Sequence, residues 1–214
     1  MNYNPIKLKQ SSSSGMDLTE QELKRLVNIL DSAPGVRVGD LRYNDLMWPS
    51  LSCHGIYAFC EGDNYKIRYE QEKVNEPLPK YLYIGKTFGV PMIGRIAGHF
   101  APRCKDYSNS LLRHIAYCMA PRNERGWIWE AHAPESYERH RADELIEKAF
   151  PVIQDLLLKV IVFEEVNDED MRQCINETER ALIVKLRPAF NYPKRFGNRQ
   201  FKIVDINNQQ VVIK

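Results

Sequence analysis

Apolar residues in this chain follow two patterns, short runs typical of strands and longer stripes typical of helices. Two short runs, Gly55-Ile56-Tyr57-Ala58-Phe59 and Tyr81-Leu82-Tyr83-Ile84-Gly85, are aromatic and β-branched, with polar, glycine or proline residues around them. Each predicts one strand of a small sheet. A third run, Leu156 to Glu165, alternates too little for an exposed strand and predicts a buried central strand.

The first helical stripe begins after residues 1 to 16, whose polar opening and four consecutive serines predict a flexible tail. Thr19 and Glu22 form a capping box, and apolar residues then recur at helical spacing until Pro34 and Gly35. The pattern predicts an N-terminal helix that packs on the core or helps the chain dimerise.

Three further helices are predicted along the chain. Pro91 suits the start of a helix whose buried face would contain Ile93, Ile96, Ala97 and Phe100. A second helix is expected from Asn109 to Cys118. Asn167 caps a third, which Pro188 stops at about Arg187.

The segments between these elements define the expected domain organisation. We expect an N-terminal tail and helix (residues 1–50), a core (51–193) and a basic C-terminal segment (194–214). The core would contain insertions at about 61–80 and 121–155. An extra strand is indicated at Tyr65 to Arg68 in the first, and an amphipathic stretch from Ser136 to Phe150 in the second.

Charge is distributed unevenly in this chain of 214 residues, whose net charge is only +2. Residues 86–125 hold seven Lys or Arg against two Asp or Glu, and residues 187–214 hold six against one. Between them, residues 127–180 hold six basic and fourteen acidic residues. Two basic segments can form one positive face for a polyanion, although ordinary solvated faces give the same counts.

Five cysteines form no Cys-x-x-Cys pair, and no signal peptide or transmembrane run is visible. This pattern indicates buried free thiols in a reducing cytoplasm, with no membrane association. A zinc site from Cys53 or Cys60 with His54 fits no closed ligand spacing.

Candidate chemistry comes from charged residues on the predicted helices. Arg95 and His99 lie four residues apart, so both can meet one ligand. Glu179 fills a gap in the apolar stripe of its helix, and a carboxylate directed toward a core is costly unless it is paired or bound to a cation. It is either a metal ligand or a stripe-edge residue that reaches water or an arginine.

Taken in order, these residues resemble the GIY-YIG nuclease superfamily, from about Ser52 to Asn191. Both name-giving tripeptides are present, Gly55-Ile56-Tyr57 and Tyr83-Ile84-Gly85, followed by the segment from Gly94 to His99, then Glu179 and Asn191. The connections from Tyr57 to Tyr83 and from His99 to Glu179 are long, which agrees with the two expected insertions. The resemblance implies an α/β fold with a small, mainly antiparallel three-stranded sheet flanked by helices.

The same resemblance implies a metal-dependent DNA endonuclease that leaves 5′-phosphate and 3′-hydroxyl ends. Its catalytic set would be Tyr57, Tyr83, Arg95, His99 and Glu179, with Glu179 as the ligand of Mg²⁺ (or Mn²⁺). Lys86 and Arg95 would bind the substrate phosphate, and Gly85 and Asn191 would support the site.

Tyr57 is expected to accept a proton from the attacking water, which requires nearby cations such as Lys86 or the metal to lower its pKa. His99 is the other candidate for this proton, or could hold Tyr57. Without the motif, Tyr57 and Tyr83 would be ordinary strand aromatics, and Arg95 a surface arginine.

Within the superfamily, a compact chain with insertions in its core is most similar to type II restriction enzymes, which belong to restriction-modification systems. The expected partner is double-stranded DNA, bound by a homodimer. The alternatives are a structure-selective repair or recombination nuclease and a non-catalytic DNA-binding module.

Overall fold

The fold was analysed in a computed structural model, which describes residues 6–8, 18–43, 48–70, 77–100, 111–129, 137–163, 168–191 and 201–207. The chain forms two compact units. The first contains residues 1–60, 79–96 and 157–191, and the second contains residues 61–78, 97–156 and 192–214. The two expected insertions lie almost wholly in the second unit.

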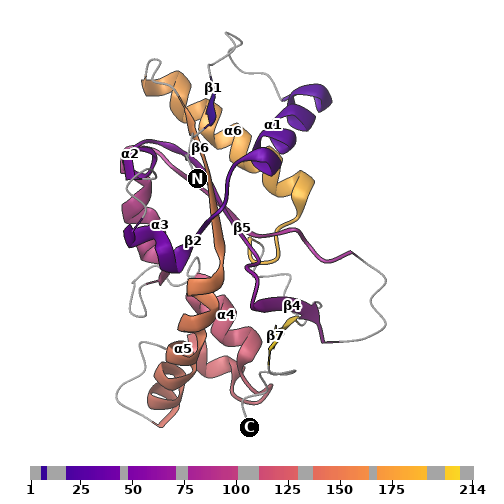
Figure 1. Ribbon diagram of the computed structural model, residues 1–214, viewed down its shortest axis with the longest axis vertical. Helices are drawn as coiled ribbons and strands as arrows, with labels where there is room; N and C mark the ends of the chain where they lie inside the picture. Colours follow the sequence, from indigo (N-terminus) through magenta and orange to yellow (C-terminus); the bar gives the residue numbers. More distant parts are fainter. Residues whose placement is uncertain are drawn as a thin grey trace. The chain divides into compact units, whose positions relative to one another are not determined.

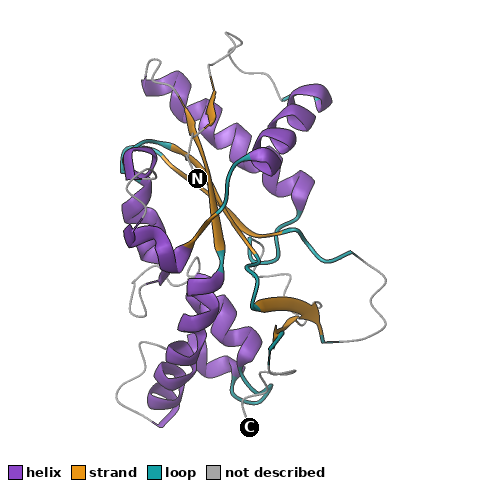
Figure 2. Cartoon of the chain, in the orientation of Figure 1, coloured by secondary structure: helices purple, strands orange, loops and turns teal. Residues whose placement is uncertain are grey.

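A five-stranded sheet organises the first unit (Figures 1 and 2). Its strands are β1 (Ile6–Leu8), β2 (Val36–Arg37), β3 (Gly55–Cys60), β5 (Tyr81–Thr87) and β6 (Leu157–Phe163). The order is β1-β6-β3-β5, and β2 also pairs with β6. The fold is therefore α/β with a mainly antiparallel sheet, as expected.

The expectation of three strands was too low. The three predicted strands form the antiparallel centre β5-β3-β6, but β1 pairs in parallel with β6 and β2 pairs with it in antiparallel orientation. β1 lies within residues 1–16, which were predicted to form a flexible tail. Runs of only three and two residues carry too little periodicity to be recognised without the partner strand.

Two helices, α1 (Glu20–Ser32) and α6 (Asp168–Leu186), pack against one face of this sheet. The capping box predicted at Thr19 and Glu22 is present, and Pro188 follows the end of α6 as expected. Alternate strand residues face these helices, because side chains point to opposite faces along a strand. The shared core includes Leu26, Leu30, Ile56, Ala58, Ile84, Ile161, Ile175 and Leu182.

Short helical segments complete the first unit. These are η1 (Val38–Tyr43), α2 (Trp48–Leu51) and the start of α3 (Met92–Phe100), whose later residues are assigned to the second unit. The buried residues of α3 are Met92, Ile96 and His99, whereas Ala97 is exposed. The predicted buried face was thus wrong at Ala97, because Met92 and His99 extend the buried stripe on the other side of Ile96.

The second unit combines helices with a two-stranded ribbon (Figure 2). Its elements are β4 (Tyr65–Tyr69), α4 (Leu111–Met119), η3 (Arg125–Trp129), α5 (Tyr137–Asp155) and β7 (Phe201–Asp205). The strand expected near Tyr65 is β4, but its partner β7 lies in the segment described from sequence only as basic. We call the β4–β7 pair the ribbon.

Candidate active site

The predicted site begins at the pairing of β3 with β5. In this register Tyr57 lies opposite Gly85, and Phe59 lies opposite Tyr83. These four residues share one face of the sheet, opposite the face covered by α1 and α6. The two tripeptides singled out in the sequence are therefore direct cross-strand neighbours.

The ring of Tyr57 lies across the backbone of Gly85. A Cβ atom added to Gly85 would be 2.4 Å from both the Cζ atom and the hydroxyl oxygen of Tyr57. A Cβ atom added to Gly55 would be only 2.0 Å from the carbonyl oxygen of Ile161 on β6. Both motif positions therefore require glycine, because no side chain fits at either of them.

Two other aromatic rings hold Tyr57 in place. The rings of Tyr57 and Tyr83 are stacked, with centroids 6.3 Å apart, and Phe59 packs edge-on at 5.9 Å. All three side chains are buried, and Tyr57 is 0% exposed. Sequence reasoning missed Phe59, although its position two residues after Tyr57 on the same strand could have indicated the contact.

Arg95 reaches the same point from α3. Its guanidinium group donates a hydrogen bond to the hydroxyl oxygen of Tyr57. The charge of Glu179, on α6, also acts on this hydroxyl, but less strongly than Arg95 does.

Glu179 and Lys86 form an ion pair at the edge strand β5. The Lys86 Nζ atom lies 2.6 Å from the Glu179 Oε2 atom, between the edge strand β5 and helix α6. Lys86 directly follows Gly85 on β5, so its side chain lies on the face of the sheet that α6 covers, and Tyr57 lies on the other face. The partner of Glu179 is thus Lys86, a lysine from the predicted site. The alternative interpretation had expected water or an arginine as the partner.

Tyr57 titrates differently from the sequence-based expectation. Burial raises its pKa well above the usual 10.0, the neighbouring Tyr83 raises it further, and Glu179 adds to the rise. The charge and hydrogen bond of Arg95 oppose these effects but do not outweigh them. In the protein alone, Tyr57 is therefore a neutral phenol at neutral pH, and the expected lowering of its pKa does not occur.

Asn191 braces the edge strand next to the site. Its Oδ1 atom accepts a hydrogen bond from the backbone nitrogen of Ile84 at 2.8 Å, and its Nδ2 atom donates to the Ile84 carbonyl oxygen at 2.6 Å. The backbone nitrogens of Ala189 and Phe190 also donate to Tyr81 and Leu82. The segment after α6 thus runs along β5 up to the residue before Gly85, as expected of a supporting asparagine.

His99 is buried within α3, one helical turn after Arg95. It falls among the residues assigned to the second unit, whereas Tyr57, Tyr83, Lys86, Arg95, Glu179 and Asn191 all belong to the first. The structure brings Gly85, Tyr83 and Arg95 to Tyr57, pairs Lys86 with Glu179 and ties Asn191 to the backbone of Ile84. The role of His99 stays a prediction.

Glu179 is the candidate ligand for a divalent cation with few protein ligands. Mg²⁺ retains several waters and is commonly bound by one or two carboxylates plus phosphate oxygens. Glu179 supplies one carboxylate, its side chain is 18% exposed, and it already attracts the Lys86 ammonium group. Within the described ranges, no cluster of three or more His, Cys, Asp and Glu side chains suits a metal.

Cys53, Cys60, Cys118 and Cys174 form no disulfide, as expected, and Cys60 and Cys118 are buried. Cys53 and Cys174 are only half-buried, so the prediction of buried thiols was wrong for these two, and Cys104 lies outside the described residues. In the part of the chain that the structure covers, no helix combines the length and apolar character that a membrane span requires.

Comparisons with family models, with curated proteins and with solved structures find no match to this chain.

Proposed function

We propose that this protein is a metal-dependent DNA endonuclease of the GIY-YIG type. The observation that supports it best is the convergence on Tyr57. The phenol lies over Gly85, receives a hydrogen bond from Arg95 and is influenced by the charge of Glu179. A phenol, a guanidinium group and a carboxylate around one point can serve phosphodiester hydrolysis.

Each group has a distinct part in the proposed reaction. Arg95 binds the scissile phosphate and offsets the charge that grows on it in the transition state. Glu179 would hold Mg²⁺, which would act as a Lewis acid on the phosphate. Lys86 supplies a second positive charge for the substrate beside Glu179.

Tyr57 starts as a proton donor in this proposal, because its raised pKa keeps the hydroxyl protonated. In that form it can donate a hydrogen bond to a phosphate oxygen while Arg95 fixes its oxygen atom. A cation held by Glu179 would neutralise the carboxylate and remove its contribution to the raised pKa of Tyr57, while burial, the largest cause, would remain.

Among nucleases, we favour a type II restriction enzyme that cuts both strands of a specific duplex site. One catalytic set per chain serves one strand, so two copies related by a two-fold axis would place two sets on opposite strands. A homodimer on DNA follows from this proposal.

Incubation with supercoiled plasmid and with branched duplexes in Mg²⁺, followed by sequencing of the ends, tests the proposal. We expect discrete plasmid fragments with 5′-phosphate and 3′-hydroxyl ends, and no cleavage in the presence of a chelator. Nicking confined to branches would favour the repair-type nuclease. Duplex binding without hydrolysis in either Mg²⁺ or Mn²⁺ would favour the non-catalytic DNA-binding module.

A further inference from the structure

The ribbon has two chemically different faces. Ile67, Phe201 and Ile203 are at most 3% exposed, and the rings of Tyr69 and Phe201 are stacked at 5.1 Å. This face packs on α4. Lys66, Arg68, Lys202 and Val204 alternate with these residues along the strands and occupy the opposite face.

The outward face concentrates positive charge. Arg68 lies directly opposite Lys202, and Lys66 is two residues before Arg68 on the same side of β4. Glu61 pairs with this group, 3.7 Å from Arg68 and 3.9 Å from Lys66. Three cations against one carboxylate leave this face with a net positive charge.

Arg68 is both exposed and oriented. Its side chain is 45% exposed, and Glu61 and the carbonyl oxygen of Ile67 contact one nitrogen of its guanidinium group. Glu61 also accepts a hydrogen bond from the Ile67 backbone nitrogen at 2.6 Å, which ties the carboxylate to the strand. Such contacts hold an arginine ready to use its other donors on a ligand.

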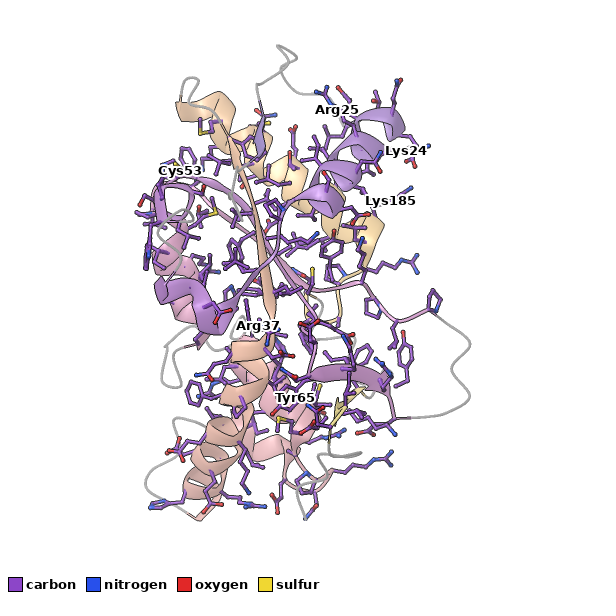
Figure 3. The ribbon with its side chains drawn as sticks, in the orientation of Figure 1. Lys24, Arg25, Arg37, Cys53, Tyr65 and Lys185 are labelled. Atoms are coloured by element: carbon purple, nitrogen blue, oxygen red, sulfur yellow. The ribbon has the colours of Figure 1, made fainter. Side chains whose placement is uncertain are left out.

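The base of the ribbon is fixed by a buried carboxylate at the end of α5. Asp155 is 4% exposed and accepts hydrogen bonds from the backbone nitrogens of Asn64 and Tyr65, at 2.8 Å and 3.0 Å. It also accepts one from the Asn64 side chain at 2.7 Å. Tyr65, at the start of β4, is labelled in Figure 3. The ribbon is therefore a supported element with a defined orientation within its unit.

We propose that the outward face of the ribbon enters the major groove of duplex DNA and that Arg68 reads a base there. A two-stranded ribbon fits the major groove of B-DNA, and arginine pairs with the O6 and N7 atoms of guanine. The deep, narrow major groove of duplex RNA admits no such element.

This proposal rests on the proposed nuclease function, in which DNA is the partner. One experiment can test base reading by Arg68 separately from nuclease activity. A duplex library with a randomised central segment is incubated with the wild-type protein and with Arg68→Ala and Arg68→Lys. Arg68→Lys keeps the charge but loses the planar fork. Bound duplexes are sequenced in chelator, and cut duplexes are sequenced in Mg²⁺.

We expect the wild-type protein to enrich one sequence pattern. Both Arg68 variants should lose preference for guanine at one position of each half-site, on the order of tenfold. Arg68→Lys should keep the wild-type salt dependence of binding, whereas Arg68→Ala should flatten it. Arg25→Ala, which removes an exposed arginine from α1 (Figure 3), should keep the wild-type pattern.

The inference is overturned if both variants enrich the wild-type pattern, or if the wild-type protein enriches none. Enrichment without cleavage in Mg²⁺ would instead refute the proposed nuclease and leave the ribbon as a DNA reader. Circular dichroism checks that each variant is folded. Lys202→Gln is the second variant if Arg68→Ala does not fold, and it should weaken binding to all sequences alike.

Discussion

Tyr57 contacts Gly85, and the position of the Tyr57 ring depends on the lack of a side chain at Gly85. The phenol ring occupies the space that a Cβ atom of residue 85 would need. Arg95 then binds a hydroxyl that stacking on Tyr83 has already oriented. The geometry of the candidate site thus depends on close packing as much as on its charged groups.

Replacement of Gly85 by alanine should disable the site without removing its chemistry. The added Cβ atom, 2.4 Å from the Tyr57 hydroxyl oxygen, must displace the ring from Arg95. A displacement of about 1 Å can reduce an enzymatic rate on the order of 10²-fold, and we expect a loss of this size in plasmid cleavage. Gly126→Ala is the control, because nothing lies within 4 Å of its added Cβ atom. Equal rates for the two variants would refute the steric argument.

The raised pKa of Tyr57 should make the free energy of unfolding depend on pH at high pH. A tyrosine in the unfolded chain loses its proton near pH 10, whereas folded Tyr57 retains it because burial raises its pKa. Above about pH 10 the unfolded state binds fewer protons than the folded state, so the free energy of unfolding falls as the pH rises. Below that pH the contribution is constant.

Urea unfolding of wild-type protein and Tyr57→Phe between about pH 9 and about pH 11 measures this effect. The decline should be shallower in the variant, since Tyr81 and Tyr65, whose pKa values are also raised, are present in both proteins. Parallel declines would mean that Tyr57 titrates like an exposed tyrosine.

At the scale of elements, periodicity was sufficient for α1, α4, α6 and the three central strands. It failed where an element depends on a distant partner. β7 pairs with β4 across more than a hundred residues, and β1 has only three residues. His99 was not expected in the buried stripe of α3, because polarity alone favours exposure. The Lys86–Glu179 ion pair joins a strand to a helix, and no local pattern predicts such a pair.

The asparagine at the end of α6 should contribute to stability as well as to the site. Asn191→Ala removes two hydrogen bonds to the backbone of Ile84, and we expect a loss of about 1–3 kcal/mol in the free energy of unfolding. Asn28→Ala, at an exposed position of α1, should change it by less than about 0.5 kcal/mol. Urea denaturation followed by circular dichroism gives both values. A loss no greater than that of the control would show that the edge strand needs no such brace.

At the scale of the whole molecule, the two units divide the proposed work. The first holds the residues gathered around Tyr57, and the second holds the basic face of the ribbon. The sequence indicated the insertions that form most of the second unit. It did not indicate which segments of the chain come together in that unit. Segments 61–78, 97–156 and 192–214 join through tertiary contacts, which leave no signature in local periodicity.

The role of Glu179 as the metal ligand is tested by the cleavage rate of Glu179→Gln compared with that of Glu177→Gln. Both changes replace a carboxylate by its amide on α6, but Glu179 pairs with Lys86 and its charge acts on Tyr57, whereas Glu177 accepts a hydrogen bond from Gln173. In Mg²⁺, Glu179→Gln should cut duplex DNA at least roughly 10²-fold more slowly than wild type, with duplex binding retained, and Glu177→Gln should cut normally. Cleavage by Glu179→Gln at the rate of Glu177→Gln would contradict the assignment of this site as the metal-dependent active centre.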